Sequence, residues 1–172
     1  MGIRDRGRVY EGYTEDRDLT TAAVIASIAG HQGTSLDHRH TVAATAKHFL
    51  GDGTTDGGIE GGNATMTDQV MRETYLPPYA AAVNEGIASI MVGFNSYNGI
   101  NLHQHTHLVT DVLKGELGFK GVVVSDWNGG IRFGEPHTVI NAGVDIAMQP
   151  GNHDEFMSKL KASVLDKTVP MS

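Results

Sequence analysis

The segment GVVVSDW at residues 121–127 decides the fold class of this 172-residue chain. Its three consecutive valines are apolar whichever face they present, which is typical of a buried strand in a parallel sheet. The run ends in Ser125 and Asp126, and the only tryptophan of the chain, Trp127, follows directly. Because parallel strands are covered by helices, the sequence on either side should alternate between strands and helices.

The chain does alternate in this way. Four apolar runs that end in Gly, Asp or Asn are predicted strands: 41–49, 88–94, 121–125 and 145–148. Stretches with helical character lie between or after them: 20–29, 68–84, 106–117 and 152–165. Each return crosses about ten residues or more, as parallel strands require. The pattern predicts an α/β fold, either a TIM-type barrel or a doubly wound sheet, and four strands make half a barrel.

Composition excludes several classes of function. Thirteen Lys and Arg against 20 Asp and Glu give a net charge of −7, with no basic run, so we expect neither nucleic acid nor a membrane as a partner. The absence of cysteine excludes disulfides and thiolate metal sites. Neither a signal peptide nor a membrane-spanning run is recognisable. The glycine-rich stretches lack the spacing of phosphate-binding loops, so no cofactor is predicted.

Asp126 and Trp127 are the first candidate site residues. A carboxylate at the end of a buried strand beside an aromatic ring suits a sugar, whose C–H face stacks while its hydroxyls form hydrogen bonds. The structural alternative is that Asp126 caps the following loop and Trp127 belongs to the core. Position in the sequence leaves these two interpretations equally open.

Lys47 and His48 end the first predicted strand together. Strand alternation would send the two side chains to opposite sides, although a bend at Gly51 could bring both to the rim. With Asp52 they could clamp a polyhydroxylated ligand. The alternative is a solvated lysine and a core histidine bonded to the main chain.

His103, His105 and His107 occupy alternate positions, and on an extended strand they would share one face and could bind a metal. This stretch runs directly into a predicted helix, however, which would scatter the three side chains. We therefore interpret them as structural and predict no metal site.

Together these motifs resemble glycoside hydrolase family 3, in particular its β-glucosidases and exo-β-glucan glucohydrolases. The similarity rests on KHFLGDG at 47–53, NSYNG at 95–99 and LVTDVLKGELGFKGVVVSDW at 108–127, supported by GRVYEGYTED at 7–16 and INAGVDIAM at 140–148. The resemblance implies that residues 1–172 are the C-terminal half of that family's N-terminal barrel domain. The expected fold is therefore an incomplete TIM-type (β/α) barrel of about four parallel strands with intervening helices.

The resemblance also implies roles for individual residues. Asp126 matches the catalytic nucleophile. The residues matched to binding of the −1 sugar are Arg8, Lys47, His48 and Met91. Trp127 and Arg132 match residues that reach the +1 sugar, and Glu60 matches the rim of that subsite. Phe94 stands where some members have a tyrosine whose hydroxyl touches the nucleophile.

The implied activity is retaining hydrolysis of β-linked glucosides or glucan oligosaccharides through a covalent glycosyl-enzyme, without a cofactor. In this branch of the family the acid/base comes from a second domain, so the chain alone is expected to be inactive or weak. Its expected partners are the remainder of the enzyme or other copies of itself, and the parent enzyme would be periplasmic or secreted. The alternatives are an inactive half-barrel or carbohydrate-binding remnant, and an unrelated α/β domain.

Overall fold

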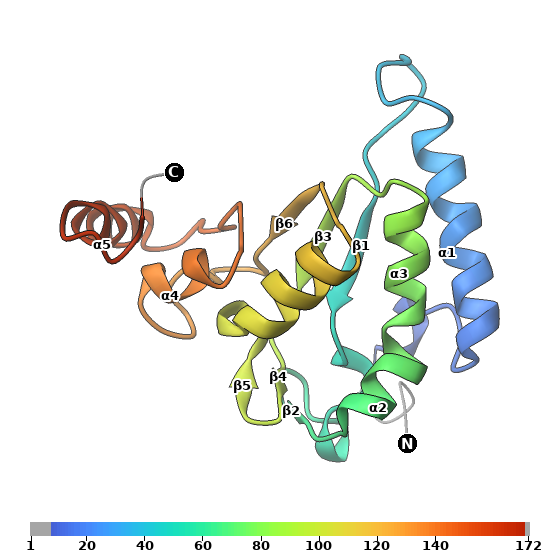
Figure 1. The fold of residues 1–172 in the computed structure, drawn as a ribbon, viewed down its shortest axis with the longest axis horizontal. Helices are drawn as coiled ribbons and strands as arrows, with labels where there is room; N and C mark the ends of the chain where they lie inside the picture. The colour runs from blue at the N-terminus through green and yellow to red at the C-terminus, as the bar shows by residue number, and fades with distance from the viewer. Residues whose placement is uncertain (1–7, 171–172) are drawn as a thin grey trace.

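The computed structural model of the protein describes residues 8–170, and its centre is a parallel sheet (Figure 1). The sheet contains β1 (Thr45–Phe49), β3 (Ser89–Val92) and β6 (Val122–Val124) in that order. Both pairs of neighbours are parallel. The incomplete barrel predicted from the sequence is thus confirmed, with strands inside three of the four predicted ranges.

The fourth predicted strand, 145–148, is corrected to a single bridge between Val124 and Ile146. The reason lies in Asp145, whose carboxylate accepts the N–H of Val123 at 2.8 Å and receives Lys114 Nζ at 2.7 Å. The carboxylate of Asp145 therefore accepts the N–H of Val123, which in a regular sheet would donate to a main-chain carbonyl of the neighbouring strand. The N–H groups of Asp145 and Ile146 both donate to the carbonyl of Val123, which anchors the segment beside β6.

The connections between the strands are largely helical. The α-helices are α1 (Arg17–Gln32), α2 (Asp68–Val70), α3 (Pro77–Asn84), α4 (Pro136–Asn141) and α5 (His153–Leu165). Two segments form wider π-helical turns, η5 (Met71–Tyr75) and η7 (His107–Glu116). Each lies within one of the predicted helical ranges. Short 3-10 turns are η2 (Val9–Glu11), η3 (Asp52–Thr54), η4 (Asp56–Gly58) and η6 (Leu102–Gln104). Helix α1 packs beside α3, whereas α4 and α5 lie at the opposite side of the molecule (Figure 1).

A second, small sheet was not predicted. It consists of β2 (Asn63–Ala64), β4 (Ser96–Tyr97) and β5 (Ile100–Asn101), and it lies below the parallel sheet in the view of Figure 1. Strands β4 and β5 form a tight antiparallel pair. Asn98 and Gly99 between them adopt positive φ angles of 48° and 89°, which asparagine and glycine tolerate better than other residues. The hairpin carries the NSYNG motif.

The core lies on one face of the parallel sheet. Ile90, Val92 and Val123 are completely buried in a cluster that includes Leu108 and Leu113 from η7. Residues that alternate with them on the strands are less buried, so the strands are not covered equally on both faces as their apolar runs suggested. Within residues 8–170, the helices are too short or too polar to cross a bilayer.

Gly121 shows how closely β6 approaches its neighbours, and we expect Gly121→Ala to destabilise the fold by about 2 to 3 kcal/mol, the usual cost of overpacking. The added methyl group would collide with the carbonyl oxygen of Ala88 and the ring of Phe119. Gly30→Ala is the matched control, because the methyl group would meet open space in the last turn of α1. This control should gain about 0.5 to 1 kcal/mol from helix propensity. Chemical denaturation measures both changes, and equal effects would contradict the prediction.

Candidate active site

A bulge in β1 directs Lys47 and His48 toward the carboxyl edge of the sheet. Ala46 pairs with Ile90 and Phe49 pairs with Val92, so β1 has one residue more than β3 between these two pairs. A bulge of this kind re-aims side chains that strict alternation would separate. The irregularity that re-aims these side chains lies within the strand itself, rather than at Gly51, where a bend was expected.

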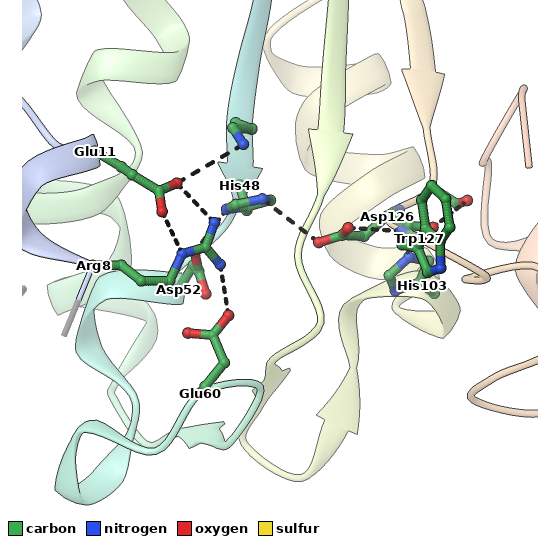
Figure 2. A network of polar contacts seen from close by, with 10 residues as sticks. Arg8, Glu11, His48, Asp52, Glu60, His103, Asp126 and Trp127 are labelled. Carbon is green, nitrogen blue, oxygen red and sulfur yellow. Dashed lines mark hydrogen bonds and ion pairs between the residues drawn. The ribbon is translucent and has the colours of Figure 1, made fainter. Parts of the chain in front are cut away.

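His48 lies between two carboxylates (Figure 2). Its Nδ1 is 2.8 Å from Asp52 Oδ2, and its Nε2 is 3.5 Å from Asp126 Oδ2. The His48 side chain is only 8% exposed and that of Asp126 15%. His48 in β1 and Asp126 after β6 therefore meet at the carboxyl edge of the sheet, and the buried ring of His48 pairs with carboxylates rather than with the main chain.

Asp126 follows β6 with its carboxylate directed at His48. Its Oδ1 accepts the main-chain N–H of Trp127 at 2.6 Å, which fixes the orientation of the carboxylate. The Trp127 ring is 56% exposed, so the alternative in which it belongs to the core is wrong. An oriented carboxylate beside an open indole face can bind and attack a sugar ring.

A second group of charges adjoins Lys47. Arg8 donates to both carboxylate oxygens of Glu11, at 2.6 and 2.7 Å, and to Glu60 Oε1 at 2.6 Å (Figure 2). Lys47 Nζ is 3.9 Å from the same Glu11. The hydrogen bond from Arg8 lowers the pKa of Glu11 to about 2, so Glu11 is an anion at neutral pH. Sequence reasoning identified Arg8, Lys47 and Glu60 but missed Glu11, which lies within the motif at 7–16.

Arg132 lies over the ring of Phe94 in a cation–π pair. The guanidinium carbon lies 4.3 Å from the centre of the Phe94 ring and 5.5 Å from that of Phe133. Arg132 also borders an open pocket, whose other lining residues are Asn128, Ile131, Gln149, Gly151 and Asn152. This pocket adjoins the segment that follows Asp126, and four of its six lining residues carry polar side chains.

Met91 occupies the less buried face of β3, between the fully buried Ile90 and Val92. Its register partner on β6 is Val124, two residues before Asp126. This places Met91 close to the sheet edge where the polar residues gather.

His103 contacts the main chain of Asp126. Its Nε2 accepts the Asp126 N–H at 3.0 Å, and its Nδ1 lies 3.1 Å from Asn101 Oδ1. His105 is buried beside Tyr97, whereas His107 pairs with Asp111 at 3.1 Å on an exposed surface. The three histidines are scattered, as predicted. Over the described part of the chain, no group of three His, Asp or Glu side chains is arranged to hold a metal ion.

Comparison with known proteins agrees with this arrangement. The chain is 38% identical to a β-xylosidase from Formosa agariphila over 95% of its length, which is 24% of that protein. The exo-1,3/1,4-β-glucanase of a Pseudoalteromonas species superposes on 99% of the chain with a TM-score of 0.92 and 37% identity. The β-glucosidase of Listeria innocua, solved with glucose, matches 97% of the chain with a TM-score of 0.86 and 31% identity.

The chain spans 23% and 25% of the lengths of those two structures. The sequence model of the glycosyl hydrolase family 3 N-terminal domain matches residues 2–172, which is nearly the whole chain. The sequence match, the similar structures and the grouped strand-end residues all lead to one assignment. The chain belongs to glycosyl hydrolase family 3, within its N-terminal domain.

Proposed function

We propose that the protein carrying this chain hydrolyses terminal non-reducing β-D-glucosyl residues of β-glucosides or β-glucans, with retention of configuration. The observation that carries the proposal is the 3.5 Å approach of His48 Nε2 to Asp126 Oδ2. In the proposal, His48 binds sugar hydroxyls directly beside the carboxylate that becomes glycosylated. The Listeria innocua relative was solved with glucose, which supports a glucosyl substrate.

In the proposed reaction, Asp126 attacks the anomeric carbon while the bond from that carbon to the aglycone oxygen breaks and the protonated aglycone leaves. Water then hydrolyses the covalent glycosyl-enzyme, which releases the sugar and regenerates the carboxylate. The Trp127 N–H holds Oδ1 of the carboxylate, so that attack comes from an oriented group. Lys47, His48 and Arg8 bind the hydroxyls of the −1 sugar. The exposed ring of Trp127 contributes a stacking face for the next sugar.

We assign the chain to the C-terminal half of the barrel and propose that the acid/base carboxyl group belongs to another part of the enzyme. This agrees with the share of the relatives that the chain spans, about a quarter. The partner of the site is then the remainder of the enzyme. A carbohydrate-binding remnant without turnover is the alternative that the experiment below separates.

The test is mechanism-based labelling of the full-length enzyme with a 2-deoxy-2-fluoro-β-glucoside that carries an activated leaving group. We expect the label on the peptide that contains Asp126, located by mass spectrometry, and its loss in Asp126→Asn. A label on another carboxylate would contradict the assignment, and binding without labelling would support the remnant.

The β-xylosidase relative raises a second candidate substrate, a terminal β-xylosyl residue. Xylose lacks the 6-hydroxymethyl group of glucose, so the two sugars differ by the contacts that this group makes. Parallel labelling with the 2-fluoro-xyloside decides between them. We expect faster inactivation by the glucoside, and the reverse order would assign the protein to xylosides.

A further inference from the structure

The main chain of Asp126 is held by a histidine that the proposed mechanism does not use. His103 Nε2 accepts the Asp126 N–H at 3.0 Å (Figure 2). Asp126 is thereby fixed at two points, since its Oδ1 accepts the N–H of Trp127. The hydrogen bond from Asp126 to His103 joins the end of β6 to η6, 23 residues earlier in the chain.

Only one tautomer of His103 satisfies these contacts. Because Nε2 accepts a hydrogen bond from a main-chain N–H, it must be unprotonated, so the ring proton resides on Nδ1. Nδ1 then donates to Asn101 Oδ1 at 3.1 Å, and Asn101 in turn is anchored to the carbonyl of Phe94 at 2.7 Å. Asn101 therefore selects the tautomer that can hold Asp126.

The surroundings keep His103 neutral. The residue is completely buried, and its ring stacks on Phe133 at a centroid distance of 4.9 Å and near Phe94 at 6.3 Å. Burial and the neighbouring charge of Arg132 lower the pKa of His103 to about 4. A protonated ring would donate from both nitrogens and would leave the Asp126 N–H without an acceptor.

The ring is also confined in position. A methyl group added at Gly129 would collide with Nε2 and Cδ2 of His103, so the loop after Asp126 wraps closely around the imidazole. The Gly129 N–H donates to the carbonyl of Asp126 at 2.9 Å, which closes a turn around the same ring. The chain therefore turns around the ring of His103 immediately after Asp126, the proposed nucleophile.

We propose that His103 is a positioning residue for Asp126, a neutral imidazole whose Nε2 holds the Asp126 main chain so that the carboxylate meets the anomeric carbon. This inference rests on the proposed function. Its physical basis is the sensitivity of nucleophilic attack to geometry, since a displacement of about 1 Å can cost about 10²-fold in rate. His103 touches neither the sugar nor the reacting atoms in this proposal.

The kinetic test compares substitutions at His103 in the full-length enzyme. His103→Phe keeps a ring but removes the acceptor, and we expect kcat to fall about 10- to 100-fold with KM changed less than about threefold. His103→Gln places an amide oxygen near the position of Nε2 and should recover most of the lost kcat. A His103→Phe enzyme as active as the parent, or a His103→Gln enzyme no better than His103→Phe, would overturn the proposal.

His105 provides the matched control. It is also buried and accepts a main-chain N–H, from Leu108 at 3.3 Å, but this contact lies away from Asp126. His105→Gln should lower thermal stability while kcat stays within about threefold of the parent value. If His105→Gln reduces kcat as much as His103→Phe does, the effect reports general stability rather than positioning.

A spectroscopic measurement tests the inference without turnover. In the full-length protein labelled with ¹⁵N-histidine, the His103 ring should remain neutral with the proton on Nδ1 from pH 8 down to about pH 5. Its signals are assigned by their loss in His103→Gln. A proton on Nε2 would overturn the proposal. If the parent enzyme takes no label on Asp126, the proposed function fails, and the tautomer of His103 is still determined separately.

Discussion

Replacing Asp126 by asparagine should abolish turnover, with kcat lower by about 10⁴-fold or more, the loss typical when a catalytic nucleophile is removed. The fold should survive, because the amide is isosteric and its oxygen can still accept the N–H of Trp127. Steady-state kinetics of the full-length enzyme and its thermal unfolding measure the two effects. The capping interpretation makes the opposite forecast, a loss of stability with little loss of activity.

Asp126→Gly extends the same prediction. Azide should partly restore cleavage of an activated β-glucoside, because the small anion enters the space that the carboxylate vacates. The product should be a glucosyl azide of inverted, α configuration, which NMR identifies. Asp145→Asn is the control: Asp145 begins the neighbouring segment but binds Val123 and Lys114, so this variant should lose stability and gain nothing from azide. A β-configured azide, or no rescue, would contradict the assignment of Asp126.

The 172-residue chain by itself should leave cellobiose and laminaribiose uncleaved and should act at best feebly on an activated aryl β-glucoside. Protonation of the leaving group is worth about 10² to 10⁴-fold, and an activated aryl group needs it least. Glu60 and Asp56 are the first internal candidates for the acid. Glu60 accepts a hydrogen bond from Arg8 at 2.6 Å. Hydrogen bonding from Thr65 lowers the pKa of Asp56, whereas a general acid requires a raised pKa.

A coupled assay for released glucose checks this prediction, with the Asp126→Asn chain as the control for background hydrolysis. Robust cleavage of cellobiose by the 172-residue chain would contradict it. In that case Glu60→Gln and Asp56→Asn would show which internal carboxylate serves as the acid.

The parallel sheet could be predicted because its strands are short apolar runs that end in polar residues. The run at 145–148 is also short and largely apolar, yet it forms only a bridge. The side chain of Asp145 accepts the N–H of Val123, which in a strand pair a main-chain carbonyl would accept. Composition cannot distinguish these two ways of satisfying the N–H of Val123. Helix α4 was missed for another reason, because six residues are too few to show a helical period.

The site was predictable where it depends on the ends of strands. His48 and Asp126 follow from the rule that the carboxyl ends of parallel strands meet at one edge. The contact of His103 with Asp126 depends on how η6 returns beneath that edge, and the spacing of the three histidines carries no information about it. The one available signal was Asn101, a residue able to fix a histidine tautomer two positions before the ring.

The carboxylate of Asp145 also bears on the solubility of the chain. An uncovered edge strand favours edge-to-edge association, because its unpaired main-chain groups can form hydrogen bonds with a strand of another molecule. Here the N–H of Val123 is occupied by Asp145, and its carbonyl by the N–H groups of Asp145 and Ile146. At Val123, the middle of β6, an incoming chain would find no free donor or acceptor, and it would meet the ion pair of Asp145 and Lys114 instead.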